Sequence, residues 1–307
     1  MNLMVVGGAG FLGSHVVDRL LGEGSVVSRI DVVDDLSGGT LANLAAARNS
    51  AGGRLNIHAL DAATPEFTTV VERAAPTVIL VTAAFADARS DVHSAARSYL
   101  LVTSVLEAAR SARVPKVVVT VPAIGLYGDV PVRDLPVKED HPHRPVGASG
   151  VTAASVLELL DHYRSDHNVD FTALALATVY GPRQRDDANV VAALLAAARD
   201  GREATVHGDG CQTRDLVYVT DVVDALVRAV TKGSGLVLNI GTGKQTSVSE
   251  LWSIIGGNRG VVKVPARPFD VKRCALSPSR ARLQLGWTPW TSVAEGVVST
   301  AASLTTD

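Results

Sequence analysis

The sequence predicts an α/β protein built on a doubly wound parallel sheet, because apolar runs of strand length alternate with amphipathic stretches of helix length. A glycine-rich turn directly after the first apolar run supports the same class. Strands read as continuously apolar when helices bury a parallel sheet on both faces. The predicted strands are 3–6, 30–33, 55–58, 78–81, 116–121 and 171–175, and the predicted helices are 11–22, 40–48, 66–74, 90–112 and 148–165.

The regular alternation ends after Tyr180-Gly181-Pro182, where shorter helices and loops rich in glycine and proline begin. This change predicts a smaller C-terminal domain that is partly interleaved with the first. Helices are expected near 187–200, 220–231, 247–255 and 292–303. We assign residues 1–175 to the larger domain, with about 213–238 returning to it, and residues 176–212 and 239–307 to the smaller one.

The composition is that of a globular protein, with 307 residues, 47% of them hydrophobic and 20% charged. A formal net charge of −2 without basic runs predicts no nucleic-acid or membrane surface. Cys211 and Cys274 lie far apart without metal-ligand spacing, so we expect two reduced thiols and no metal site. The chain shows no signal-peptide pattern and no apolar stretch long enough to span a bilayer, which predicts a cytoplasmic protein.

Three glycines follow the first predicted strand in the pattern Gly7-x-x-Gly10-x-x-Gly13, and Phe11 and Leu12 open the helix. The first glycine permits a sharp turn, the second lets backbone approach a pyrophosphate, and the third lets the helix pack on the strand. The helix N-terminus then offers unpaired N–H groups and a partial positive charge to phosphates. This turn therefore predicts a Rossmann-type dinucleotide site.

An acid for the adenosine ribose is expected about 20 residues beyond the last glycine, and Asp34 ends the second predicted strand at that distance. Its carboxylate can accept hydrogen bonds from both ribose hydroxyls and would repel a 2′-phosphate. No arginine follows Asp34 to bind such a phosphate, so the predicted cofactor is NAD rather than NADP. Asp31 and Asp35 are the alternative acids.

Further blocks follow along nearly the whole chain, and with them the sequence resembles a known family. It is similar to the extended short-chain dehydrogenase/reductases that are NAD-dependent nucleotide-sugar epimerases and dehydratases, with UDP-glucose 4-epimerase the nearest type. The blocks are Asp34-Asp35-Leu36-Ser37, Leu60-Asp61, Ala83-Ala84, Leu126-Tyr127-Gly128, Val179-Tyr180-Gly181-Pro182-Arg183-Gln184, Gly208-Asp209-Gly210-Cys211-Gln212-Thr213-Arg214-Asp215, Asn239-Ile240-Gly241-Thr242-Gly243, Arg267-Pro268-Phe269-Asp270 and Leu285-Gly286-Trp287.

The resemblance implies two ligands, NAD and a UDP- or dTDP-type nucleotide sugar that the smaller domain binds. Asp61 would lie near the adenine, and Ala83 would line the cofactor cleft. The cofactor contacts that it implies are Gly7, Gly10, Phe11, Leu12, Gly13, Asp34, Asp35, Ser37, Gly38, Asp61, Ala62, Ala83 and Ala84.

For the sugar nucleotide, the resemblance places Arg214 and Arg267 on the diphosphate, Asp270 on its ribose and Thr178 at a family asparagine position. A guanidinium suits this task because it can bond two phosphate oxygens at once and keeps its charge at any working pH. The alternative is that each arginine makes a structural ion pair, with Asp215 or Asp270 as the partner.

The residues that carry the family's chemistry are absent from their expected positions. The tyrosine position is Val146, the lysine position four residues later is Gly150, and the hydroxyl position is Ala123. No tyrosine anywhere in the chain is followed by lysine four residues on. Replacing Val146→Tyr, Gly150→Lys and Ala123→Ser together is therefore expected to restore some NADH formation. The candidate substitute groups are His141, His143 and Tyr127.

Two functions remain open at this point. In the first, the protein is an enzyme on nucleotide sugars with a non-standard acid/base; in the second, it binds both ligands without turnover, as a regulatory partner of an active paralogue.

The helices predicted near 94–110 and 150–164 carry more apolar surface than one face against the sheet can use. Related proteins pair these helices, so we expect a homodimer. The alternative is a helix pair buried within a monomer.

Overall fold

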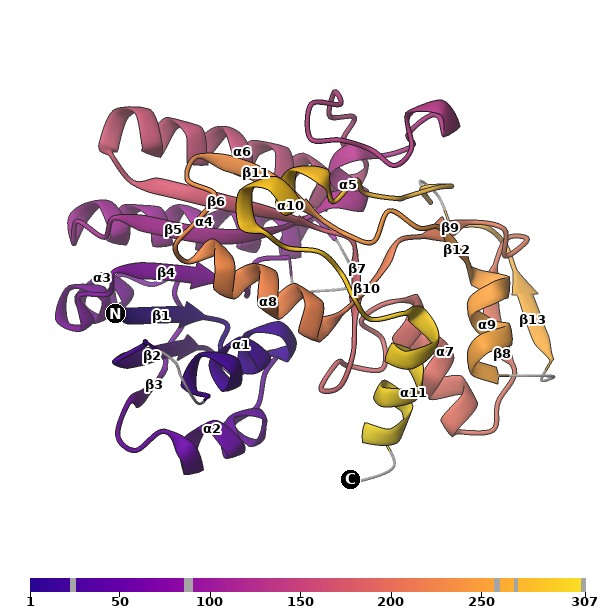
Figure 1. Ribbon diagram of the computed structural model, residues 1–307, viewed down its shortest axis with the longest axis horizontal. Helices are drawn as coiled ribbons and strands as arrows, with labels where there is room; N and C mark the ends of the chain where they lie inside the picture. Colours follow the sequence, from indigo (N-terminus) through magenta and orange to yellow (C-terminus); the bar gives the residue numbers. More distant parts are fainter. Residues whose placement is uncertain (23–25, 86–90, 257–259, 268–269, 305–307) are drawn as a thin grey trace.

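A computed structural model describes residues 1–22, 26–85, 91–256, 260–267 and 270–304 (Figure 1). Its core is a seven-stranded sheet with the order β11-β6-β5-β4-β1-β2-β3, and all neighbouring strands are parallel. This architecture confirms the predicted Rossmann-type α/β class. The strands are β1 (Asn2–Val6), β2 (Arg29–Asp34), β3 (Leu55–Ala59), β4 (Val78–Val81), β5 (Lys116–Pro122), β6 (Asp170–Leu176) and β11 (Leu236–Ile240).

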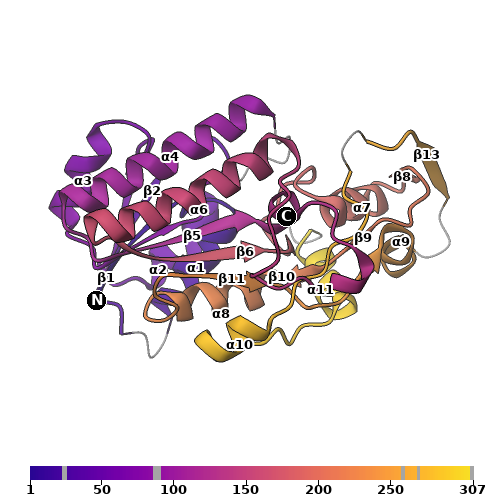
Figure 2. The same ribbon diagram turned by 90° about the horizontal axis from the view of Figure 1, so that it is seen from above.

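Helices cover both faces of the sheet (Figure 2). Helices α3 (Glu66–Ala74), α4 (Val92–Ser111) and α6 (Gly147–His167) lie on one face, and α4 packs directly beside both neighbours. On the other face α1 (Phe11–Leu21) packs against α8 (Val219–Ala229). The helix predicted over 40–48 is a 3-10 turn, η1 (Leu41–Leu44), that continues into α2 (Ala45–Ser50).

The strand order reverses between β1 and β4, because the chain builds outward from β1 in one direction and from β4 in the other. In open parallel sheets the crevice at such a switch point, outside the carboxyl ends of the strands, is where ligands bind. The glycine turn follows β1 at this edge, and Ala83 and Ala84 follow β4 there.

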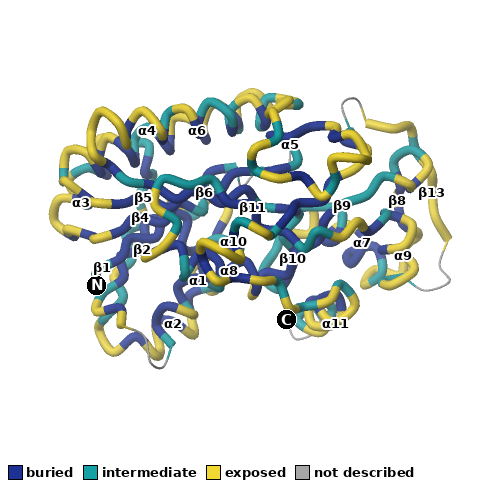
Figure 3. The backbone as a smooth tube through the Cα atoms, turned by 45° about the horizontal axis from the view of Figure 1, so that its top comes forward, coloured by how far each residue is buried: buried dark blue, intermediate teal, exposed yellow. Residues whose placement is uncertain are grey.

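Most of the remaining elements lie beyond the carboxyl ends of the sheet (Figures 1 and 3), whereas α10 (Ser279–Leu285) packs against α8 and β11. They include three two-stranded pairings that the sequence did not predict, because strands this short carry no readable apolar period. The strand pairs are β7 (Thr178–Tyr180) with β10 (Leu216–Tyr218), β9 (Thr213–Arg214) with β12 (Thr246–Ser247), and β8 (Ala204–His207) with β13 (Val261–Val264). The helices are α5 (Ala123–Tyr127), η2 (Val132–Asp134), α7 (Val190–Arg199), α9 (Val248–Gly256), α10 (Ser279–Leu285) and α11 (Val293–Ser303).

Strand β11 pairs with β6 at the edge of the central sheet and runs through the predicted boundary between residues 238 and 239. That boundary therefore falls inside a strand. The division into two domains itself stays a prediction. None of the helices in the described ranges is long and apolar enough to cross a membrane.

A fully buried carboxylate ties the outer elements to the sheet edge. Asp215 accepts hydrogen bonds from the backbone N–H groups of Thr242 (2.8 Å), Gly243 (3.0 Å) and Leu276 (2.9 Å). The Thr242 hydroxyl donates to the same carboxylate at 2.7 Å, and the Asp215 carbonyl accepts from Thr178 N at 3.0 Å. Burial raises the pKa of Asp215, while these donors oppose the rise. Since its oxygens are engaged in this way, Asp215 is not the ion-pair partner of Arg214.

Candidate cofactor and substrate site

A cleft of about 400 Å³ opens at the carboxyl ends of the strands, at the switch point. It brings together residues from the ends of β1, β2, β3, β4 and β5 and from the loop after β7. Of the predicted cofactor residues, all but Gly13 line it: Gly7, Gly10, Phe11, Leu12, Asp34, Asp35, Ser37, Gly38, Asp61, Ala62, Ala83 and Ala84. Thr178 lies in the wall as well, together with Thr82, Thr120, Pro122, Ile124, Arg97, Arg183 and Arg185.

The glycine turn has the geometry that a pyrophosphate needs. Gly7 has φ +85, and a Cβ there would lie 2.7 Å from Ala83 N, so only glycine fits. A Cβ at Gly13 would lie 2.8 Å from the Gly7 carbonyl carbon, which explains why Gly13 packs against the turn instead of lining the cleft. Helix α1 begins after Gly10 without any side-chain cap, so its first N–H groups face the cleft end of the sheet unshielded by a side chain.

Asp34 is buried at the end of β2, 6% exposed, and lies in the cleft wall. Its two oxygens accept hydrogen bonds from Ala9 N and Leu36 N, both at 2.8 Å, so this acid also joins the glycine turn to the end of β2. The alternative acid Asp31 points away, paired with Arg29 (2.8 Å) and His58 (2.9 Å), and it does not line the cleft. Asp35 does line it.

Arg97 is a cleft residue that the sequence did not reveal. It lies on α4, and its guanidinium contacts Asp35 Oδ2 at 2.5 Å and Asp61 Oδ2 at 3.1 Å. No arginine stands in the loop directly after Asp34, and the structure brings this one from a distant helix, as residues that meet at a sheet edge commonly do. An isolated arginine on an amphipathic helix gives no sequence signal for such a position.

The three positions at which the sequence predicts the family's catalytic residues to be absent lie in α5 and α6 or directly beside them. Ala123 is completely buried at the start of α5, and Val146 precedes α6 with its N–H donating to Gly125 O at 2.9 Å. The backbones of Gly150 and Gly125 are in close contact. A Cβ on Gly150 would lie 2.7 Å from the Gly125 carbonyl carbon, so the contact leaves no room for a side chain at position 150. None of the three lines the cleft as it stands.

This packing argues against the expectation that the Tyr, Lys and Ser replacements would restore NADH formation. A lysine at position 150 would drive its Cβ into the backbone of α5, which cannot be relieved by changing a neighbouring side chain. The sequence does not predict this contact. A glycine within a helix indicates only a lower helix propensity, and not that two backbones approach each other closely.

Tyr127, one candidate substitute, belongs to the core. It is 1% exposed, and its hydroxyl donates to Asn239 Oδ1 at 2.9 Å. Burial, with the nearby charge of Glu139, raises the pKa of Tyr127 far above its ordinary value. Glu139 in turn accepts a hydrogen bond from Asn239 N at 2.8 Å. The phenol is therefore a structural donor and not a proton acceptor at neutral pH.

The two histidines lie beside this core and outside the cleft wall. The ring of His143 meets Tyr127 edge-on, with centroids 5.5 Å apart, and burial lowers the pKa of His143. His141 Nδ1 lies 2.9 Å from Pro142 O, and its Nε2 lies 3.8 Å from Asp134. The structure therefore brings neither predicted substitute base to the cofactor.

The residues assigned to the sugar nucleotide form a group of their own. Arg214 and Asp270 make an ion pair at 2.5 Å, and Arg214 also donates to the carbonyls of Thr213 (2.9 Å) and Val271 (2.8 Å). Arg267 is exposed three residues before Asp270, while Pro268 and Phe269 of the same block lie outside the described residues. Of the two ion-pair partners considered from the sequence, the structure selects Asp270.

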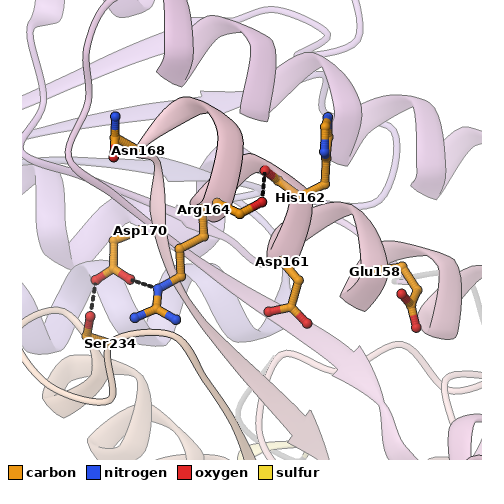
Figure 4. Close-up of a pocket in the computed structure, with 8 residues that line it drawn as sticks. Glu158, Asp161, His162, Arg164, Asn168, Asp170 and Ser234 are labelled. Carbon is orange, nitrogen blue, oxygen red and sulfur yellow. Dashed lines mark hydrogen bonds and ion pairs between the residues drawn. The ribbon is translucent and has the colours of Figure 1, made fainter.

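A second, wider depression lies at the opposite end of the sheet, beside the C-terminus of α6 (Figure 4). Within it Asp170 pairs with Arg164 (3.4 Å) and accepts a hydrogen bond from Ser234 (2.5 Å). It is an open surface feature far along the strands from the glycine turn. Nor do the described residues contain a group of three or more His, Cys, Asp or Glu side chains placed to hold a metal ion.

An uncapped helix N-terminus, a glycine cradle and an acid after β2 at one switch point define a Rossmann-type dinucleotide-binding protein of the extended short-chain dehydrogenase/reductase class. The NAD dependent epimerase/dehydratase family model matches residues 3–241. The chain belongs to this family, and the predicted cofactor, NAD, is confirmed.

Individual relatives agree with this family. The chain is 38% identical to UDP-glucose 4-epimerase of Mycolicibacterium smegmatis over 98% of this chain and 97% of the relative. Its fold is similar to the crystal structure of UDP-glucose 4-epimerase with UDP-glucose from Thermotoga maritima, with a TM-score of 0.90, 32% identity, and coverage of 100% and 99% of the two chains. It is also similar to the Thermus thermophilus UDP-glucose 4-epimerase in complex with NAD, with a TM-score of 0.88, 29% identity and 99% coverage of both chains. The protein is thus related to nucleotide-sugar epimerases.

The contact between Gly150 and Gly125 predicts an unusual response to substitution. Gly150→Ala should destabilise the protein by about 1–3 kcal/mol because of overpacking, although alanine normally stabilises a helix by about 1 kcal/mol relative to glycine. The free energy of unfolding in urea measures this difference. Ser149→Ala on the same helix is the control, with an expected change of roughly 0.5 kcal/mol or less. A stabilised Gly150→Ala variant would contradict the close packing.

Proposed function

We propose that this chain binds NAD and a UDP- or dTDP-type sugar in a site without the family's usual proton acceptor. The observation that carries the proposal is the chemistry of the cleft wall. Its described ionisable residues are three aspartates and three arginines, and no histidine, tyrosine, cysteine, lysine or glutamate is among them. The aspartates, Asp34, Asp35 and Asp61, all follow β2 and β3, at the adenosine end.

The residues present fit NAD at that end. The turn from Gly7 to Gly13 and the start of α1 would hold the pyrophosphate, and Asp34 would accept hydrogen bonds from the adenosine ribose. When bound, NAD supplies an acceptor for hydride from a sugar carbon. On the side of β5 to β7, the described wall residues offer the hydroxyls of Thr120 and Thr178 beside apolar residues, and the loop after β7 adds Arg183, Arg185 and Asn189.

The need for a proton acceptor explains why the hydride transfer that is usual in this family is not expected here. A carbinol carbon cannot give up hydride unless its hydroxyl also loses a proton, and a positioned acid/base contributes about 10²–10⁴ in rate. Val146 and Ala123 have no ionisable group, and the space for a lysine at position 150 is taken by Gly125. The arginines of the wall keep their protons at any working pH, so none of them can accept a proton from the sugar hydroxyl.

A second candidate function is a degenerate relative that binds both ligands as a regulatory partner of an active paralogue. The same observation favours it, because the predicted cofactor residues other than Gly13 line the cleft while its described wall has no histidine, tyrosine or lysine. The cytoplasmic location predicted from the sequence is the same for a non-standard enzyme and for a binding partner. Turnover of a nucleotide sugar distinguishes the two functions.

We expect no interconversion of UDP-glucose and UDP-galactose by the protein with NAD. The measurement is product analysis by chromatography together with NADH absorbance, over a panel of UDP- and dTDP-sugars. Ligand binding is measured on the same preparation by calorimetry, so that an unfolded sample is not mistaken for an inactive one. Robust epimerisation that is lost in His141→Asn or His143→Asn would contradict the proposal and identify the base.

The nucleotide sugar is expected to bind through Arg267 and Arg214. Arg267→Ala should weaken UDP binding roughly tenfold to a hundredfold, the loss of one charge-assisted phosphate contact, and leave the melting temperature unchanged because this side chain is exposed. Arg214→Ala should lower both the affinity for UDP and the melting temperature, since it also leaves Asp270 without its ion-pair partner. Lys244→Ala is the control for a general loss of positive charge. Unchanged UDP affinity in both arginine variants would contradict the proposed binding role and show that the ion pair of Arg214 with Asp270 is structural.

The protein is also expected to form a homodimer through α4 and α6. These neighbouring helices expose Tyr99 (39%), Leu100 (54%) and Val151 (56%), an apolar strip that a second copy would cover. Light scattering should give a dimeric mass, and Leu100→Glu with Val151→Glu should give a folded monomer. Val298→Glu on α11, at an apolar position that is even more exposed (70%), should remain dimeric. A monomeric wild-type protein at micromolar concentration would contradict this prediction.

A further inference from the structure

Arg97 lines the cleft on the side of Asp35 and Asp61, the predicted adenosine end. Its side chain is half exposed, and it leaves α4 to reach Asp35 after β2 and Asp61 after β3. Three elements that are distant in sequence therefore meet at one guanidinium, which also lines the cleft.

The two carboxylates hold this guanidinium in place. In each of them one oxygen accepts hydrogen bonds from its own loop and the other oxygen contacts Arg97. Asp35 Oδ1 accepts from Ser37 N (3.0 Å) and Ser37 Oγ (2.6 Å), which leaves Oδ2 for Arg97. Asp61 Oδ1 accepts from Ala63 N (2.9 Å), which likewise leaves Oδ2 for Arg97. Partial burial opposes ionisation of Asp35, but the hydrogen bonds of Ser37 and the charge of Arg97 keep the pKa of Asp35 below its ordinary value.

Both carboxylates contact the same nitrogen of Arg97, Nη2, so neither ion pair occupies the planar face of the guanidinium. Such a face stacks on aromatic rings, and stacking on a nucleobase depends on the plane as well as the charge. Because two carboxylates contact one guanidinium here, its charge is already engaged and is not offered to an additional phosphate.

From this geometry we infer that Arg97 is a positioning residue for the adenine of NAD, which it covers with its guanidinium plane while Asp35 and Asp61 hold it in place. This inference rests on the proposed cofactor site and assigns a residue to it. The preference for NAD over NADP then comes from Asp34 and not from Arg97.

Calorimetric titration of the full-length protein with NAD, ADP-ribose and UDP tests this role. Arg97→Gln should weaken NAD and ADP-ribose binding about tenfold each, without changing UDP binding or the order of NAD over NADP. Arg97→Lys keeps the charge and loses the plane, so it should recover only a small part of the affinity. Arg110→Gln, which removes an exposed arginine from the same helix and its pair with Glu107, should change no affinity.

The outcomes separate the alternatives. Full recovery of NAD affinity in Arg97→Lys would overturn the stacking role in favour of charge alone. Unchanged NAD affinity in Arg97→Gln, with a lower melting temperature, would reduce Arg97 to a structural ion pair. A wild-type protein that binds UDP but neither NAD nor ADP-ribose would instead overturn the proposed function, and this inference with it.

Discussion

Helix α1 reaches the carboxyl ends of β1 and β4 only because Gly7 and Gly13 carry no side chain there. A Cβ on Gly7 would meet Ala83 N at 2.7 Å, and one on Gly13 would meet the backbone of the turn. The close approach places the uncapped start of α1 at the switch point of the sheet, beside Asp34. This contact between backbones places the glycine turn next to Ala83, and both lie in the wall of the cleft.

The same kind of contact has the opposite consequence on the other side of the cleft. Gly125 and Gly150 let α5 and α6 touch backbone to backbone, and that contact fills the space from which the family's lysine would extend. Nearby in the chain, Tyr127 at the end of α5 donates a hydrogen bond to Asn239 Oδ1, and Glu139 accepts one from Asn239 N. The fold is thus similar almost end to end to that of a UDP-glucose 4-epimerase, and the predicted cofactor residues other than Gly13 line its cleft.

Charged residues of this protein commonly serve the fold and the site together. Asp34 joins the glycine turn to β2 while lining the cleft, and Arg214 fixes Asp270 and two backbone carbonyls in the region assigned to the sugar nucleotide. Groups with two partners are held more rigidly than groups with one, which favours recognition by preformed contacts. It also means that a substitution at such a residue changes stability and affinity at once.

The sequence by itself determined the sheet, its covering helices, the glycine turn and Asp34, because these depend on local apolar period and on spacing along one strand–turn–helix unit. It also predicted that the family's tyrosine, lysine and hydroxyl residue are absent from their positions, since a residue type can be read directly. Only the tertiary structure decided that Arg97 reaches Asp35 and Asp61, that Asp270 and not Asp215 pairs with Arg214, and that Tyr127 and His143 lie outside the cleft wall. Those contacts join segments tens of residues apart, and the free space around Gly150 depends on how two helices pack, which no spacing within either helix encodes.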